Sequence, residues 1–169
     1  HNFEKNALQA MTVEISLKRL NYVIKRINST YCQTALRKAK KLSETLECIQ
    51  AIEGSGSKFL DSLPTGRITA KTDFEYGDSF LLHLNKAIQI LESAKTDENS
   101  MAQTELRLTI DEVKKLAQEV RAFLNQELLN YVYWAEQEKA CYTPIHTEFL
   151  REFWDKKTSI LTSATISVA

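Results

Sequence analysis

Glycine and proline are scarce in this sequence, with four glycines and two prolines in 169 residues. Because glycine and proline are typical of the turns that connect short strands, their scarcity favours long helices. All four glycines, together with Pro64, fall between residues 54 and 77. We therefore expect a mainly α-helical chain with one long glycine-containing connection at residues 54–79, and a short strand near residues 67–76.

Cysteine is also rare, and long apolar runs are missing. Cys32, Cys48 and Cys141 form no Cys-x-x-Cys pair, and three thiols cannot supply four ligands to a zinc or iron–sulfur site. We expect reduced, mostly buried thiols and no metal site. No stretch approaches the ~20 apolar residues that cross a bilayer, and the first residues lack the layout of a signal peptide. These absences predict a cytoplasmic protein without a membrane partner.

An excess of charge of one sign is absent overall, because 22 Lys and Arg balance 22 Asp and Glu. Any signal for nucleic acid must therefore be local. One such signal lies between Glu14 and Glu44, where no acidic residue occurs and eight basic residues do: Lys18, Arg19, Lys25, Arg26, Arg37, Lys38, Lys40 and Lys41. Such a run fits a surface that follows the phosphates of a single strand, and it equally fits the solvated face of a helical protein.

Apolar side chains repeat at helical spacing in four stretches of the chain. They step by three and four residues along 13–27, 35–49, 81–91 and 106–124, which places each set on one stripe of a helix. Narrow stripes are typical of antiparallel helices packed at shallow angles. The sequence predicts an elongated antiparallel four-helix bundle. Its first helix would span about 2–28, and its fourth, about 100–130, would be about 45 Å long.

After residue 129 the pattern changes to short extended segments. Residues 130–136 are β-branched and aromatic and predict a strand. A second extended piece is expected near Tyr142 to Ile145, followed by a helical turn at 148–155 and an apolar strand at 158–163. We therefore divide the chain into a helical domain at 1–129 and a strand-and-helix segment at 130–169.

The two ends of the chain carry a resemblance to a known family. Thr162-Ser163-Ala164-Thr165, at the end of an apolar strand, resembles motif III of superfamily-two helicases. His1-Asn2-Phe3-Glu4 looks like the last residue and the continuation of the Asp-Glu-Ala-His box of DinG/XPD-type helicases. That family places its helical arch domain between these two motifs, and residues 131–150 are similar to its return from the arch into the first motor domain. The Asp and Glu of the box are absent from this sequence, so the resemblance implies a part of a longer protein.

The resemblance implies a function as well. The chain would be the arch that guides and separates single-stranded DNA in an ATP-dependent DNA helicase, with 5′-to-3′ polarity and a place at the bacterial nucleoid. His1, Thr162, Ser163 and Thr165 would couple the nucleotide state to the elements that grip DNA. The eight basic residues and Trp134 would contact single-stranded DNA, although an aromatic residue in a strand is more often part of the core.

Catalysis would reside in the parent protein rather than in this chain. The sequence has no phosphate-binding Gly-rich loop and no Asp-Glu pair at a strand end. We expect no cofactor here, with ATP and Mg²⁺ held by the rest of the helicase motor; an iron–sulfur cluster in the parent stays an open question. The alternative is a free-standing helical-bundle module that binds proteins and has no nucleic-acid role.

Overall fold

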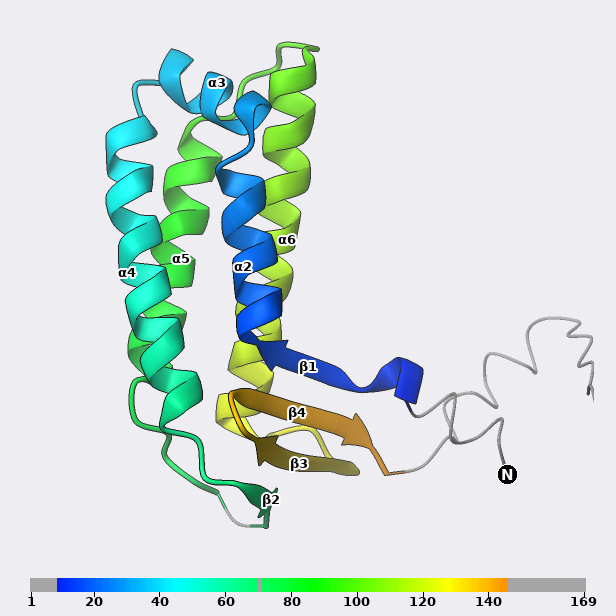
Figure 1. The fold of residues 1–169 in the computed structure, drawn as a ribbon. Coiled ribbons are helices and arrows are strands. Elements are labelled where there is room, and N and C mark those ends of the chain that lie inside the picture. Colours follow the sequence, from blue (N-terminus) through cyan, green and yellow to red (C-terminus); the bar gives the residue numbers. More distant parts are fainter. Residues whose placement is uncertain (1–8, 70, 146–169) are drawn as a thin grey trace, which may run out of the picture.

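The computed structural model describes residues 9–69 and 71–145, which are mostly helical and include a small antiparallel sheet (Figure 1). The helices are α2 (Leu17–Ile27), α3 (Thr30–Lys38), α4 (Leu42–Asp61), α5 (Gly77–Ser93) and α6 (Met101–Asn125). The strands are β1 (Val13–Ser16), β2 (Gly66–Ile68), β3 (Tyr131–Glu136) and β4 (Lys139–Pro144). In this part of the chain, no helix has both the length and the hydrophobicity that a membrane crossing requires.

Four long helices, α2, α4, α5 and α6, run side by side, with α3 across one end and the sheet at the other (Figure 1). A cluster of aromatic rings joins the helices to the sheet. The ring of Phe59 on α4 lies 5.8 Å from Phe80 on α5 and 6.2 Å from Phe123 on α6, and Phe123 lies 6.2 Å from Tyr133 on β3. All four side chains are buried, so one hydrophobic core spans helices and sheet.

The predicted first helix is wrong at its beginning. Within the described residues, 9–11 are helical, Val13–Ser16 form a strand, and α2 starts only at Leu17. Val13 and Ile15 are β-branched and alternate with polar residues, which suits a strand. Ser16 then ends the strand, because its hydroxyl accepts a hydrogen bond from the Arg19 N–H at 3.4 Å and caps the helix.

The predicted second helix is broken, and the predicted long connection is too long. Lys40 adopts a left-handed conformation with φ 56°, which separates α3 from α4. Helix α4 then continues through Gly54 and Gly56 to Asp61, so the connection expected at 54–79 shrinks to 62–76. The fourth helix also ends early, at Asn125, because Gln126 has φ 53°; its 25 residues span about 37 Å.

The small sheet confirms the predicted strands at 130–136 and near 142–145. Its order is β1-β4-β3-β2, and every neighbouring pair is antiparallel. The strand predicted near 67–76 corresponds to β2, which is only three residues long. In the register of β1 with β4, Val13 lies opposite Tyr142 and Ser16 lies opposite Lys139. The described chain therefore enters α2 from β1 and leaves α6 through β3, and the following strand β4 lies beside β1.

The two glycines of α4 differ in their surroundings, and this difference predicts opposite effects of alanine. A Cβ atom at Gly56 would lie 2.7 Å from Leu20 Cδ2 and 2.9 Å from Phe80 Cε2, whereas one at Gly54 would meet nothing within 4 Å. We expect Gly56→Ala to lower the free energy of unfolding by about 1–3 kcal/mol. Gly54→Ala should raise it by up to about 1 kcal/mol, because alanine loses less backbone entropy in a helix. Urea unfolding of both variants measures this, and shifts of the same sign would refute the packing of α4 on α2 and α5.

Candidate nucleic-acid interface

Four predicted functional residues, His1, Thr162, Ser163 and Thr165, lie outside the described residues. Their coupling role stays a prediction. The other candidates, the eight basic residues and Trp134, all lie within the described part of the chain.

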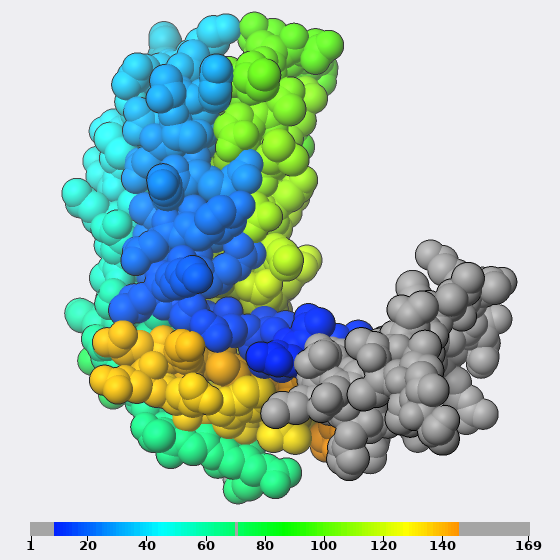
Figure 2. Space-filling view, turned by 45° about the vertical axis from the view of Figure 1, so that its right-hand side comes forward, coloured from blue at the N-terminus to red at the C-terminus, as the bar shows by residue number. Residues whose placement is uncertain are grey.

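The basic residues occupy α2, α3 and the turn that follows. In the space-filling view, these helices form one continuous face beside α6 (Figure 2). Lys18 and Lys25 are seven residues apart on α2 and both exposed, and Arg37, Lys38 and Lys40 are exposed on α3 and in the turn after it. A single patch made by all eight residues stays a prediction, and their side chains fall into two groups.

Arg19 and Arg26 belong to the first group, because they pair with carboxylates of α6. Arg19 Nη1 lies 2.8 Å from Glu112 Oε2 and its Nε lies 3.5 Å from Glu119 Oε2, while Arg26 Nη2 lies 2.7 Å from Glu105 Oε1. Burial disfavours the charged guanidinium of Arg19, yet the hydrogen bond to Glu112 and the two negative charges raise its pKa overall. These two arginines hold α2 against α6 and are not free to bind phosphates.

The second group consists of cations at the surface. Lys38 and Lys41 form exposed ion pairs, at 3.2 Å with Glu98 and at 2.9 Å with Glu44, and such pairs contribute little in water. The described residues provide no ion pair for Lys18, Lys25 or Lys40, and the Arg37 guanidinium donates only to the Gln33 side chain, at 3.4 Å. We define the basic face as Lys18, Lys25, Arg37 and Lys40.

Tyr22 is a candidate that the sequence analysis missed. It lies between Lys18 and Lys25 on α2, and 44% of it is exposed. The guanidinium carbon of Arg19 lies 5.6 Å from its ring centroid, and Arg26 Nη1 donates a hydrogen bond to its hydroxyl at 3.3 Å. A fixed aromatic ring among cations can stack on a base. Its spacing, four residues after Lys18 and three before Lys25, was the available signal.

Trp134 lies on the sheet rather than on the basic face. It is half-buried on β3, opposite Arg67 of β2 and Cys141 of β4. Its indole Nε1–H donates to Glu136 Oε1 at 3.2 Å. The structure therefore separates Trp134 from α2 and α3 and gives it Arg67 as its basic neighbour.

The three cysteines are buried and unpaired, as predicted. Burial raises the pKa of Cys32 and of Cys141 to about 11. Their thiols therefore stay protonated at neutral pH and are poor nucleophiles and poor metal ligands. Over residues 9–69 and 71–145, no three His, Cys, Asp or Glu side chains are grouped so that they could hold a metal ion.

Comparisons of the chain with protein-family models, with curated proteins and with solved structures returned no match.

Proposed function

We propose that the chain is the helical arch of an ATP-dependent DNA helicase of the DinG/XPD type. In this proposal α2, α4, α5 and α6 form an antiparallel four-helix bundle that leaves the motor near residue 13 and rejoins it after residue 144. The motor itself would bind ATP and Mg²⁺ and would act at the bacterial nucleoid, with 5′-to-3′ polarity.

The observation that supports this proposal best is the pairing of β1 with β4. A segment inserted into a host domain needs ends that lie close together. Here Val13, before α2, lies opposite Tyr142, which follows α6 and β3. Helices α2 to α6, together with β2 and β3, thus lie in the chain between two adjacent strands, which suits an excursion from a larger domain.

The basic face supports a role in guiding a single strand. Lys18, Lys25, Arg37 and Lys40 are exposed and keep their charges for phosphates, and Tyr22 adds a ring that can stack on a base. The glutamates of α6 next to this region form their ion pairs with Arg19 and Arg26. They therefore do not neutralise the positive charges of the exposed lysines.

A second candidate is a helical module that binds another protein. It is favoured by exposed apolar side chains on the helices, above all Leu82 on α5 and Met101 and Leu108 on α6. On this reading the basic face would be solvated and would contact no nucleic acid.

Binding of single-stranded DNA distinguishes the two candidates. We expect the double variant Lys18→Gln/Lys25→Gln to bind a labelled oligo-dT about tenfold more weakly at low salt, with a log–log salt slope smaller by about 1.4, since each phosphate contact contributes about 0.7. Fluorescence anisotropy at several salt concentrations measures both quantities. Lys86→Gln/Lys115→Gln is the matched control, because these lysines lie on α5 and α6 and leave the basic face intact. A salt slope equal to that of the parent chain would show that the basic face does not contact DNA.

A further inference from the structure

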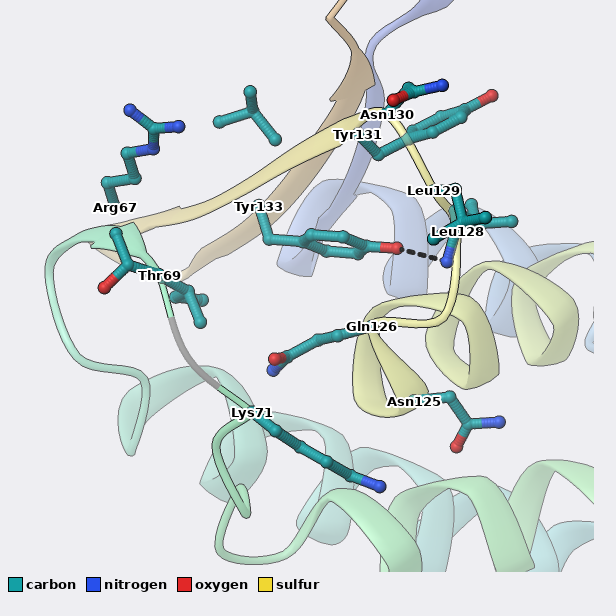
Figure 3. Close-up of a pocket in the computed structure, with 12 residues that line it drawn as sticks. Arg67, Thr69, Lys71, Asn125, Gln126, Leu128, Leu129, Asn130, Tyr131 and Tyr133 are labelled. Atoms are coloured by element: carbon teal, nitrogen blue, oxygen red, sulfur yellow. Dashed lines mark hydrogen bonds between the residues drawn. The ribbon is translucent and has the colours of Figure 1, made fainter.

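Four exposed apolar side chains lie on the three helices that form the face in Figure 2. They come from α2, α3 and the first half of α6, and each is 44–65% exposed. We call them the apolar seam: Tyr22, Tyr31, Met101 and Leu108. Exposed leucines also occur elsewhere, with Leu82 on α5 and with Leu128 and Leu129 in the segment between α6 and β3 (Figure 3). The apolar seam differs from these because its members lie along the boundary of α2 and α3 with α6.

Leu108 is placed at this boundary by its neighbours on α6. Glu105 precedes it by three residues and Glu112 follows it by four, and residues at these spacings share one side of a helix. Both glutamates face α2, because Glu105 pairs with Arg26 at 2.7 Å. Glu112 pairs with Arg19 at 2.8 Å. Leu108 is therefore an exposed apolar neighbour of the ion pairs that join α2 to α6.

Met101 and Tyr22 lie beside the same ion pairs. Met101 precedes Glu105 by four residues and so shares its side of α6. Tyr22 is linked to Glu105 through the guanidinium of Arg26. Its Nη1 donates to the Tyr22 hydroxyl at 3.3 Å, and its Nη2 donates to Glu105 Oε1 at 2.7 Å. The Tyr22 ring therefore stands on the side of α2 that looks toward α6.

Tyr31 extends the apolar seam onto α3. It shares a face of this helix with Lys38, which follows it by seven residues. Lys38 Nζ lies 3.2 Å from Glu98 Oε1, and Glu98 precedes Met101 by three residues. This ion pair places Tyr31 on the side of α3 that faces the start of α6.

The lysines of the basic face have different neighbours on their two flanks. Tyr22 follows Lys18 by four residues and precedes Lys25 by three, on the α6 side. The other flank of α2 carries Asn21 and Asn28, which are exposed amides. A strand whose phosphates contact both lysines thus meets an apolar surface toward α6 and a polar surface away from it. Bases stack on rings and aliphatic surface, so the α6 side is the one that suits them.

We propose that a single DNA strand lies with its phosphates on the basic face and its bases turned toward α6, on the apolar seam, an inference that rests on the proposed function. The two tyrosine rings stack on bases, and Met101 and Leu108 supply the aliphatic surface between them. Glu105 and Glu112 lie beside this path, but their ion pairs with α2 leave little negative charge to repel the strand.

Fluorescence anisotropy of a labelled oligo-dT with the 169-residue chain tests this orientation. Tyr31→Ala should weaken binding about tenfold, which is a usual effect of losing one stacking ring. Met101→Ser/Leu108→Ser should weaken it about threefold, because less apolar surface is buried. Neither change should alter the log–log salt slope, because the removed side chains carry no charge. This readout separates base contacts from the phosphate contacts of the lysines.

Leu82→Ser is the matched control, because Leu82 is 66% exposed on α5 and lies outside the apolar seam. It should bind as the parent chain does, and thermal unfolding confirms that each variant is folded. A second measurement needs no variant. An oligo-dT that contains 4-thiothymidine, irradiated on the parent chain, should attach its bases to Tyr22 or Tyr31, which mass spectrometry of the digested chain locates.

The outcomes separate this inference from the proposed function. If the seam variants bind like the parent while Lys18→Gln/Lys25→Gln binds more weakly, the bases do not lie on α6, the arch proposal stands, and Met101 and Leu108 are left to a protein partner. An equal loss of binding in Leu82→Ser, or bases attached to α4 instead, would also overturn the orientation. If the parent chain does not bind the strand at all, both proposals are wrong.

Discussion

Replacing Arg19 with methionine should lower the free energy of unfolding by about 2 kcal/mol at neutral pH. Methionine keeps the aliphatic stem but leaves the carboxylates of Glu112 and Glu119 without their cation. Removing one partner of a fully buried ion pair costs about 3–5 kcal/mol. We expect a smaller value because 19% of the Arg19 side chain and 13% of the Glu119 side chain remain exposed.

The pH dependence of this loss follows from Glu119. Burial raises the pKa of the Glu119 carboxyl above its ordinary value, even with Arg19 beside it. The folded state therefore takes up this proton more readily than the unfolded state, and the contribution of Glu119 to stability increases as the pH falls through the raised pKa. Without Arg19 the pKa should rise further. The deficit of Arg19→Met should thus be largest at neutral pH and should shrink on acidification.

Urea unfolding at several pH values measures this prediction, with two controls. Arg19→Met/Glu112→Gln/Glu119→Gln should recover most of the lost stability, because the two amides replace both uncompensated charges. Lys25→Met, on the same helix but without an ion pair in the described chain, should stay within about 0.5 kcal/mol of the parent. A deficit that is constant with pH, or that persists when both glutamates are replaced, would show that Arg19 acts through packing alone.

Much of the fold could be predicted, because the apolar residues at helical spacing in α5 and α6 are the residues that the neighbouring helices bury. Leu84 and Leu91 of α5, and Leu106 and Val113 of α6, lie on the predicted stripes and are buried. Strand β1 was missed, because Val13 also fits the period of the helix that follows. In that overlap the N-cap at Ser16, rather than periodicity, decides where the helix begins.

The role of Gly56 depends on contacts between distant segments. A glycine inside a helix is taken as a loop signal unless the neighbours that need the space are known, and here they are Leu20 and Phe80. The break at Lys40 is instead a local helix end, where the Lys41 N–H donates to the Leu36 carbonyl at 2.8 Å. It was missed because the residue in the left-handed position is a lysine rather than a glycine.

The ion pairs of the candidate site were not predicted. Lys18, Lys25, Arg37 and Lys40 are exposed, whereas Arg19 and Arg26 pair with glutamates of α6. A signal for this existed in the sequence, because Glu105, Glu112 and Glu119 recur every seven residues, as Arg19 and Arg26 do. Which helix faces which could not be read from a single sequence, and so the match between the two series was not apparent.

Removing the helices tests most directly whether they form an excursion from a motor. Ser16 lies opposite Lys139 at the base of the helices. In the protein extended at both ends through its motor, residues 17–138, which comprise α2 to α6 with β2 and β3, can therefore be replaced by Asn-Gly, a two-residue turn that joins antiparallel strands as a hairpin. The full-length extended protein and a variant with Asn-Gly inserted between Lys95 and Thr96 serve as controls for folding.

Hydrolysis of ATP and separation of a DNA duplex are measured on the same preparations. We expect the shortened protein still to hydrolyse ATP, because the motor closes over a β1–β4 hairpin, but no longer to separate strands. Undiminished strand separation by the shortened protein, or the absence of any ATP hydrolysis by the full-length extended protein, would contradict the proposed arch.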